Sequence, residues 1–340
     1  MNPLSLPMAG VPEPEPIDVA AMQEEVRELA RSRDAVILAH NYQVPEIQDV
    51  ADYVGDSLGL SQQAAKVDNP VIAFCGVHFM AETASILCPD KRVLLPDPNA
   101  GCSLADSITP DELAAWQAHH PGAQTVMYVN TTAEIKALTD YCCTSSNAVG
   151  VVEHVLREHG PDTEILFGPD MFLGAYVEKT TGHHNMHVWS GECHVHAGIR
   201  PRDITEVREA HPGAEFLIHP ECGCVTSVME YVAAGDVDAE GVHMLSTGGM
   251  LKFAQQAERE HPGETVIVAT ETGMLYPMCK AAPDVTFVAA NPAATCRFMK
   301  MITLPKLRDT LRDMTGEVKV PEDIAARARI PIERMVSITG

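Results

Sequence analysis

VILAHNYQ, residues 36–43, decides the fold of this 340-residue chain. Its apolar half predicts a short buried strand, and its polar half begins where a parallel strand would end. The same layout occurs in TVMYVNT at 125–131 and in EFLIHPE at 215–221. The polar residues at the three strand ends, 88 and 91 positions apart, are His40, Tyr128 and His219. Because ligands bind at the carboxyl ends of parallel strands, we expect these side chains to face one cavity.

Alternating strands and helices extend from this stretch along the whole chain. The pattern predicts further strands at 70–75, 91–95, 141–143, 164–167, 241–247, 265–269 and 285–289. It predicts helices at 20–33, 46–68, 80–87, 111–119, 132–139, 149–159 and 250–259, with GDSLG (55–59) loosening the second. The turn HPGA recurs 91 residues apart, at 120–123 and 211–214. We predict an α/β fold of three homologous three-layer α/β/α modules, with parallel sheets around a pseudo-threefold axis.

The same period sets the predicted division of the chain. The three modules are expected at 20–122, 123–211 and 212–303. Segment 1–19 has neither the basic residues nor the apolar core of a signal peptide, so it is not expected to be one. This Pro-rich segment is predicted to be disordered. Residues 304–340 are predicted to form a helical tail that packs back on the body.

Composition excludes several classes of protein. A net charge of −23 argues against nucleic-acid binding, since phosphates would be repelled. No apolar run reaches the length of a membrane span. Ten cysteines without a secretory signal indicate a reducing compartment, where metal binding or catalysis is expected rather than disulfides. We therefore expect a cytoplasmic protein without a membrane or nucleic-acid partner.

Three cysteines follow the repeat. Cys102, Cys193 and Cys296 each come after the last strand of a module, 91 and 103 residues apart. Equivalent positions around a threefold axis would bring three thiolates together, leaving an open position for substrate. A [4Fe–4S] cluster with one non-cysteine iron fits this set best, and zinc is the alternative.

The other cysteines and histidines favour different interpretations. Cysteines within apolar strands or helices are expected to be buried thiols that pack as small hydrophobic residues: Cys75, Cys88, Cys142, Cys143 and Cys279. Cys222 and Cys224 form a rival metal motif that lacks the common two-residue gap. Most of the His-rich stretch between His183 and His196 is expected in a surface loop, with one or two rings reaching the site.

At this point the chain resembles the quinolinate synthases, from about residue 20 to about residue 306. The motifs that carry the resemblance are AHNYQ (39–43), GDSLGL (55–60), NAGCSLAD (99–106), YVNTTAEIKA (128–137), CTSSNAV (143–149), GPD (168–170), WSGECHVH (189–196), HPEC (219–222) and STGGM (246–250). The chain departs from the family pattern by extra residues between 221 and 246, by a single cysteine around 296, and by the cysteine-rich ECGC.

The resemblance implies three α/β/α domains in one chain and a [4Fe–4S] cluster held by Cys102, Cys193 and Cys296. It implies condensation of iminoaspartate (iminosuccinate) with dihydroxyacetone phosphate to quinolinate in NAD biosynthesis. A functional link follows to the enzyme that oxidises L-aspartate and supplies iminoaspartate. The substrate-site residues implied by the matching motifs are His40, Ser57, Tyr128, Asn130, Ser145, His219, Glu221 and Thr247, with Tyr42 beside them.

The residue types suit this chemistry. Ser57, Ser145 and Thr247 each lie just before or within a helix start, where free N–H groups favour anions, and the same positions suit N-caps. Isomerisation and ring closure need proton transfer, for which we expect Tyr42, His219 and Glu221. An open iron can act as a Lewis acid when hydroxide leaves, and His196 is expected to support that site from behind.

Three other functions compete with this one. A hydro-lyase of the aconitase type would share the open-iron cluster but not the motifs. A non-catalytic iron–sulfur sensor would be expected to carry a basic helix or a partner domain, and neither is evident. A small-molecule binding protein would not need three cysteines at the repeat spacing.

Overall fold

The computed structural model describes residues 18–234 and 241–338. Within these ranges the strands form three four-stranded sheets, and every pair of neighbouring strands is parallel. The first sheet has the order β2-β1-β3-β4, from β1 (Ala35–His40), β2 (Tyr53–Gly55), β3 (Val71–Cys75) and β4 (Arg92–Leu94). The second has the order β6-β5-β7-β8, from β5 (Gln124–Tyr128), β6 (Tyr141–Cys143), β7 (Ile165–Gly168) and β8 (Met186–Val188). The third has the order β10-β9-β11-β12, from β9 (Glu215–Ile218), β10 (Val242–Met244), β11 (Thr265–Ala269) and β12 (Thr286–Ala289).

Helices flank each sheet. Those of the first module are α1 (Val19–Ser32), α2 (Pro45–Gln48), α3 (Ser57–Lys66), α4 (His78–Leu87) and α5 (Pro110–His119). Those of the second are α6 (Ala133–Lys136), α7 (Ala148–His159), α8 (Met171–Thr181), α9 (His194–Ala197) and α10 (Pro201–Ala210). The third contains α11 (Val225–Ala234), α12 (Thr247–Glu260) and α13 (Leu275–Ala281), and α14 (Leu304–Asp313) and α15 (Glu322–Ser337) complete the chain.

Local sequence explains where these elements begin. Every residue of β1 is buried, as expected for a central strand covered on both faces. The helix α5 starts with a capping box, in which Thr109 and Glu112 satisfy each other's backbone N–H groups. Asp56 and Ser246 cap α3 and α12 by accepting the N–H of Gly59 and Gly249. The helix starts beside the central strands are therefore set by short polar side chains.

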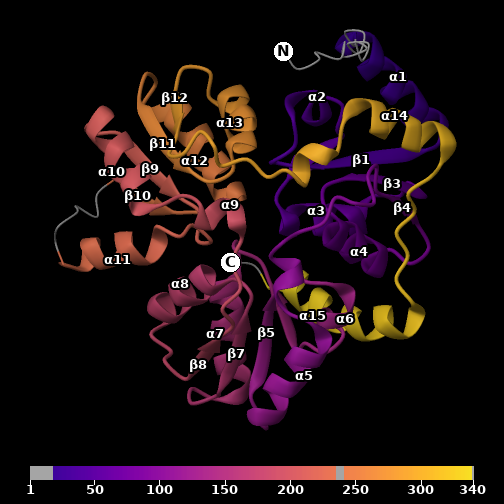
Figure 1. The fold of residues 1–340 in the computed structure, drawn as a ribbon. Coiled ribbons are helices and arrows are strands. Elements are labelled where there is room, and N and C mark those ends of the chain that lie inside the picture. Colours follow the sequence, from indigo (N-terminus) through magenta and orange to yellow (C-terminus); the bar gives the residue numbers. More distant parts are fainter. Residues whose placement is uncertain (1–17, 235–240, 339–340) are drawn as a thin grey trace, which may run out of the picture.

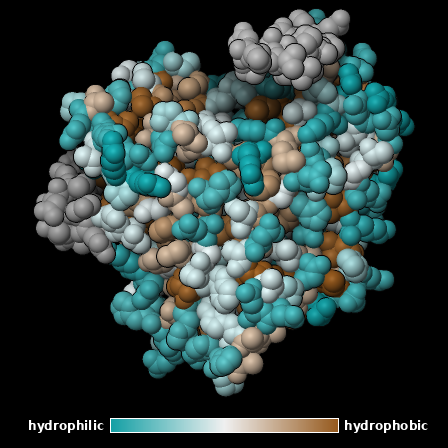
Figure 2. Space-filling model, viewed as in Figure 1, coloured by the Kyte–Doolittle hydropathy of each residue, from teal (hydrophilic) through white to brown (hydrophobic). Residues whose placement is uncertain are grey.

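The three modules surround a common centre, and the C-terminal helices join them (Figure 1). The helix α14 packs on α1, whereas α15 contacts α4 of the first module and both α6 and β6 of the second. Asn147 fixes the end of α15, since its amide donates to the carbonyls of Met335 and Ile338 at 2.9 Å. The visible surface is largely hydrophilic (Figure 2). The predicted packing of residues 304–338 against the body is thus observed.

Several predicted elements are wrong. Residues 46–68 are not one helix, because the β-branched and aromatic segment at Tyr53 pairs with β1 as the edge strand β2. Residues 186–188 form strand β8 rather than a surface loop. The predicted disorder of 1–19 lies outside the described residues up to 17, and at its end Asp18 caps α1, which starts at Val19.

Candidate active site

One pocket, with about 720 Å³ of space, lies where the three modules meet. His40, Tyr128 and His219 all line it, so the predicted convergence of the three strand ends is confirmed. The other predicted site residues that line the pocket are Tyr42, Ser57, Asn130, Ser145, Glu221, Thr247, Cys102, Cys193 and Cys296. Side chains more than 150 residues apart in sequence are thus brought to one place by the modular repeat.

The three repeat cysteines are partly buried free thiols in this pocket. Burial raises the pKa of the Cys102 and Cys296 thiols, and the nearby charge of Cys193 raises both further. Each cysteine comes from a different module. The three thiols therefore lie in one pocket, as the repeat predicted.

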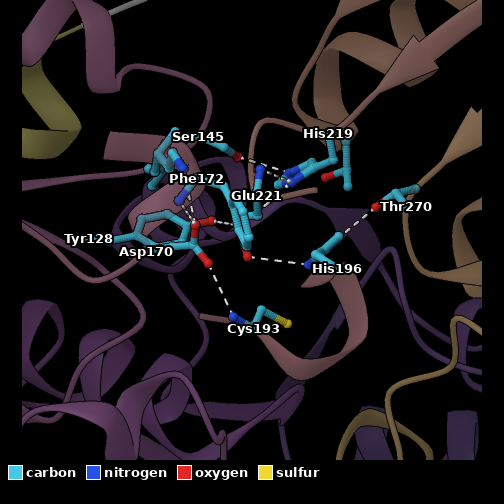
Figure 3. Close-up of polar contacts among 12 residues, drawn as sticks. Tyr128, Ser145, Asp170, Phe172, Cys193, His196, His219, Glu221 and Thr270 are labelled. Carbon is cyan, nitrogen blue, oxygen red and sulfur yellow. Dashed lines mark hydrogen bonds and ion pairs between the residues drawn. The ribbon is translucent and has the colours of Figure 1, made fainter. Parts of the chain in front are cut away.

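Glu221 is the centre of a buried charged network (Figure 3). Its carboxylate accepts a hydrogen bond from the Tyr128 hydroxyl and lies 3.3 Å from Nδ1 of His196. Burial alone would raise the pKa of Glu221, but the charge of His196 and the hydrogen bonds from His196 and Tyr128 outweigh it and lower the pKa to about 2. Burial alone would lower the pKa of His196, but its interactions with Tyr42, Cys193 and Glu221 outweigh burial and raise the pKa. The network therefore holds an ionised carboxylate beside an imidazolium.

His219 remains neutral in the same network. Its ring stacks on His196 with centroids 4.8 Å apart, and its Nε2 lies 3.2 Å from Oγ of Ser145. Burial lowers the pKa of His219 to about 3. A neutral imidazole beside a charged one can pass a proton without changing the net charge of the pocket.

His40 and Tyr42 also line the pocket. Nδ1 of His40 accepts the backbone N–H of Tyr42 at 3.1 Å, and burial lowers the pKa of His40 to about 4. The neutral ring therefore carries its proton on Nε2 as a donor. The Tyr42 hydroxyl contacts Oγ1 of Thr270 at 2.6 Å and Nε2 of His196 at 3.2 Å. Tyr42 is thus connected to Glu221 through His196.

Helix starts supply the remaining polar wall. Ser57 and Thr247 are the first residues of α3 and α12, as predicted, whereas Ser145 lies in the turn before α7. The side-chain oxygen of Asn130 is buried without a hydrogen-bond partner. Among the described residues, no lysine or arginine lines the pocket. Hydroxyl, amide, imidazole and helix N–H groups are therefore the donors available to an anion.

Two acidic side chains hold the backbone of two of the repeat cysteines. Asp170 accepts the N–H of Cys193 at 3.1 Å (Figure 3), and Glu271 accepts the N–H of Cys296 at 3.0 Å. Each carboxylate lies two residues after the third strand of its module, β7 or β11. Val77 occupies the corresponding position after β3. Two of the three cysteine loops are thus anchored in the same way.

Comparison with known proteins identifies the chain's relatives. A family model described as Quinolinate synthetase A protein matches residues 24–337. The chain belongs to the quinolinate synthetase A family. It is 56% identical over 314 residues to the quinolinate synthase of Mycobacterium leprae, covering 92% of this chain and 87% of the relative. The Mycobacterium sp. quinolinate synthase is 55% identical over 324 residues, covering 94% of both chains. This identity and coverage make the chain an enzyme of the quinolinate synthase type.

The other cysteine predictions for this family member meet mixed results. Cys75, Cys88, Cys142 and Cys143 are buried thiols, as predicted. Cys279 is exposed, so the prediction of a buried thiol there is wrong. It lies on α13, a helix that was not predicted from the sequence.

Cys222 and Cys224 are joined by a disulfide, against the expectation of reduced thiols. The tight turn that follows His219 is the geometric reason. It holds their Cα atoms 5.2 Å apart, within the range that a disulfide spans.

Sequence reasoning missed several pocket and supporting residues. Those not singled out are Asp56, Thr144, Ser146, Asp170, Thr270 and Glu271. GPD at 168–170 could have indicated one of them, because an Asp that follows a strand often caps the next helix, as Asp170 caps α8. Asp56 links modules by accepting from Ser146 at 2.7 Å, a contact that no local pattern reveals. In the described part of the chain, no helix is long and apolar enough to cross a bilayer.

Proposed function

We propose that this chain condenses iminoaspartate with dihydroxyacetone phosphate to give quinolinate, phosphate and water, as a step of de novo NAD biosynthesis. The observation that carries the proposal is the convergence of the nine predicted polar side chains and three thiols in one pocket. Its family and its relatives' names agree with this reaction. An enzyme that oxidises L-aspartate would supply the unstable imine.

Both substrates are anions, and the pocket offers neutral donors to hold them. The starts of α3 and α12 present free N–H groups beside Ser57 and Thr247, where a carboxylate or phosphate is favoured. Asn130 and the Nε2–H of His40 add directional hydrogen bonds. No lysine or arginine is among the described residues of the site, so an anion would be held by hydrogen bonds from neutral donors. Such bonds are weaker than ion pairs, which favours release of a doubly charged product.

Proton transfer is assigned to the network around Glu221. Its ionised carboxylate can accept a proton from a substrate carbon or nitrogen, and His196 stabilises that charge. His219 and Tyr42, each within hydrogen-bond reach of a second pocket group, can carry protons between substrate positions. Tyr128 orients the carboxylate by donating to it.

The thiols of Cys102, Cys193 and Cys296 suit a [4Fe–4S] cluster, because three soft sulfur donors from three loops can each bind a different iron. When bound, the cluster supplies an open iron that acts as a Lewis acid for the departing hydroxide. Asp170 and Glu271 hold the loops of two of these cysteines through their N–H groups. Phe298 and Met299 line the pocket near Cys296 and limit the access of water.

A single ion is the rival, and one observation favours it. The ligand atoms of Cys193, His196 and Glu221 lie within 4.8 Å of one another, which suits zinc. The two proposals differ in their cysteines. A zinc site of this kind would survive loss of Cys102 or Cys296, whereas a three-cysteine cluster would not.

The test is an anaerobic assay of quinolinate formation from both substrates, with iron, sulfide and zinc counted in the same preparation. We expect quinolinate only when both substrates are present, and about four irons and four sulfides per chain. No quinolinate from a preparation with a full cluster would reject the proposed reaction. Active protein with zinc and without iron would replace the cluster by the rival site.

A further inference from the structure

A cluster of metal-ligand side chains lies outside the pocket, on the second module. It consists of His120 at the end of α5, Glu164 just before β7, and His187 on β8. None of the three lines the active-site pocket. His120 and Glu164 lie at the amino ends of β5 and β7, whereas the pocket lies beyond the carboxyl ends. The cluster is therefore spatially separate from the proposed active site.

The geometry of this cluster is convergent. Nδ1 of His120 lies 2.7 Å from Oε1 of Glu164, and Nε2 of His187 lies 2.8 Å from the same oxygen. The two imidazole rings are tilted by 43° to each other, with centroids 4.3 Å apart. The three ligand atoms all lie within 4.8 Å of one another. Two imidazole nitrogens and one carboxylate oxygen are thus aimed at one small volume.

The backbone holds this arrangement in place. Leu166 of β7 pairs with His187 of β8, and the N–H of Gln124 donates to the Glu164 carbonyl at 2.8 Å. The side chains of His120, Glu164 and His187 are 24%, 33% and 44% exposed, so water can reach a bound ion and complete its coordination. A net charge of −23 also favours a cation at the surface.

We propose that His120, Glu164 and His187 bind one zinc-like divalent transition-metal ion, with water as the remaining ligand. Two histidines and one carboxylate are a ligand set that zinc accepts in tetrahedral sites. Hard cations such as Mg²⁺ prefer all-oxygen ligands and would be rejected. By joining the end of α5 to β7 and β8, the ion would tie three elements of the second module together and stabilise it.

The third module shows what the site requires. Its equivalents of His120 and Glu164 are His211, in the repeated HPGA turn, and Glu264, just before β11. The register places Phe287 of β12 opposite Val266 of β11, where the second module pairs His187 with Leu166. Phe287 has no ligand atom. The complete set is therefore specific to the second module and depends on one residue.

The test is anaerobic titration calorimetry of the cluster-loaded enzyme with zinc chloride, after removal of loosely bound metal and with iron counted before and after. We expect one zinc per chain in the wild type and a thermal midpoint raised by zinc but not by Mg²⁺. His187→Phe, which copies the third module, should weaken binding at least about tenfold. Glu164→Gln, which keeps shape and removes charge, should do the same.

His184→Ala is the matched control, because His184 is 80% exposed and pairs with Glu178, at 3.1 Å, which is not part of the cluster. It should bind zinc like the wild type. The absence of saturable zinc binding in the wild type would overturn the proposal. So would isotherms for folded His187→Phe and Glu164→Gln that match the wild type, since the zinc would then lie elsewhere.

Discussion

Glu221 carries the charge around which the groups proposed for proton transfer are arranged. Tyr128 donates to it, His196 pairs with it, and the backbone N–H of Glu221 faces Nδ1 of His219 at 3.4 Å. A buried carboxylate with a pKa of about 2 is ionised at every physiological pH. Its stabilisation therefore depends on its neighbours rather than on solvent.

Glu221→Gln should keep the cluster and stop turnover, because glutamine preserves size but cannot accept a proton. We expect kcat to fall by about 10²–10⁴-fold. The measurement is quinolinate formation by anaerobic protein whose iron content equals that of the wild type. Near wild-type output from such protein would remove Glu221 from the mechanism.

Tyr42→Phe separates proton transfer from binding. The substitution removes a hydroxyl that contacts Thr270 and His196 but leaves the ring in place. We expect kcat to fall by about 10²-fold or more, with little change in the affinity for quinolinate. A variant that loses quinolinate affinity and retains kcat would reassign Tyr42 to substrate binding.

At the scale of elements, the loops after the strands hold the site together. The TSSNA loop (144–148) is one example: Oδ1 of Asn147 accepts the N–H of Thr144 at 2.8 Å, and its amide reaches the end of α15. The same side chain therefore fixes the turn that carries Ser145 and docks the C-terminal helix.

Asn147→Ala should lower stability by about 1–3 kcal/mol, because it leaves buried carbonyls without donors. We expect a lower thermal midpoint and a higher KM, since the Ser145 turn loosens. Asn69→Ala is the control, because its hydrogen bond to Asp34 is at the surface. Equal thermal midpoints for the two variants would contradict the docking role.

Asp170→Asn and Glu271→Gln test the cysteine loops. Replacing the carboxyl acceptor of the Cys193 or Cys296 N–H by the weaker amide acceptor should loosen that loop. We expect faster iron loss to a chelator, measured by the decay of visible absorption. Asp140→Asn is the control, because Asp140 accepts the N–H of Thr125 at 2.9 Å away from the pocket. Identical decay in all three variants would show that the carboxylates do not hold the cluster loops.

Much of this could be predicted from sequence because the chain repeats itself. Short apolar runs followed by polar residues identified β1, β5 and β9 and the residues at their ends. The strands β2 and β8 were missed, because YVG at 53–55 lies within a stretch of helical spacing and MHV at 186–188 lies within the His-rich stretch. Contacts between modules, such as Ser146 with Asp56, depend on tertiary packing that no local spacing encodes. The Cys222–Cys224 disulfide was missed because the prediction of reduced thiols rested on the expected cellular compartment. That reasoning does not consider how close a tight turn brings two cysteines.

At the scale of the whole molecule, the site exists only where the modules meet. Asn41 bonds Thr247 across the first and third modules at 3.1 Å, and Ser145 meets His219 across the second and third. Each module also contributes one repeat cysteine. We propose that the one cysteine from each module, Cys102, Cys193 and Cys296, binds iron. The paired Cys222 and Cys224 do not.

Iron per chain in anaerobically purified cysteine variants tests that claim most directly. Cys102→Ser, Cys193→Ser and Cys296→Ser should each lose a stable cluster, because only three thiolates anchor it. The double variant Cys222→Ser/Cys224→Ser should keep its iron and its visible absorption, even if its activity falls through the neighbouring Glu221. A double variant without iron, together with a Cys296→Ser variant that keeps it, would contradict the account.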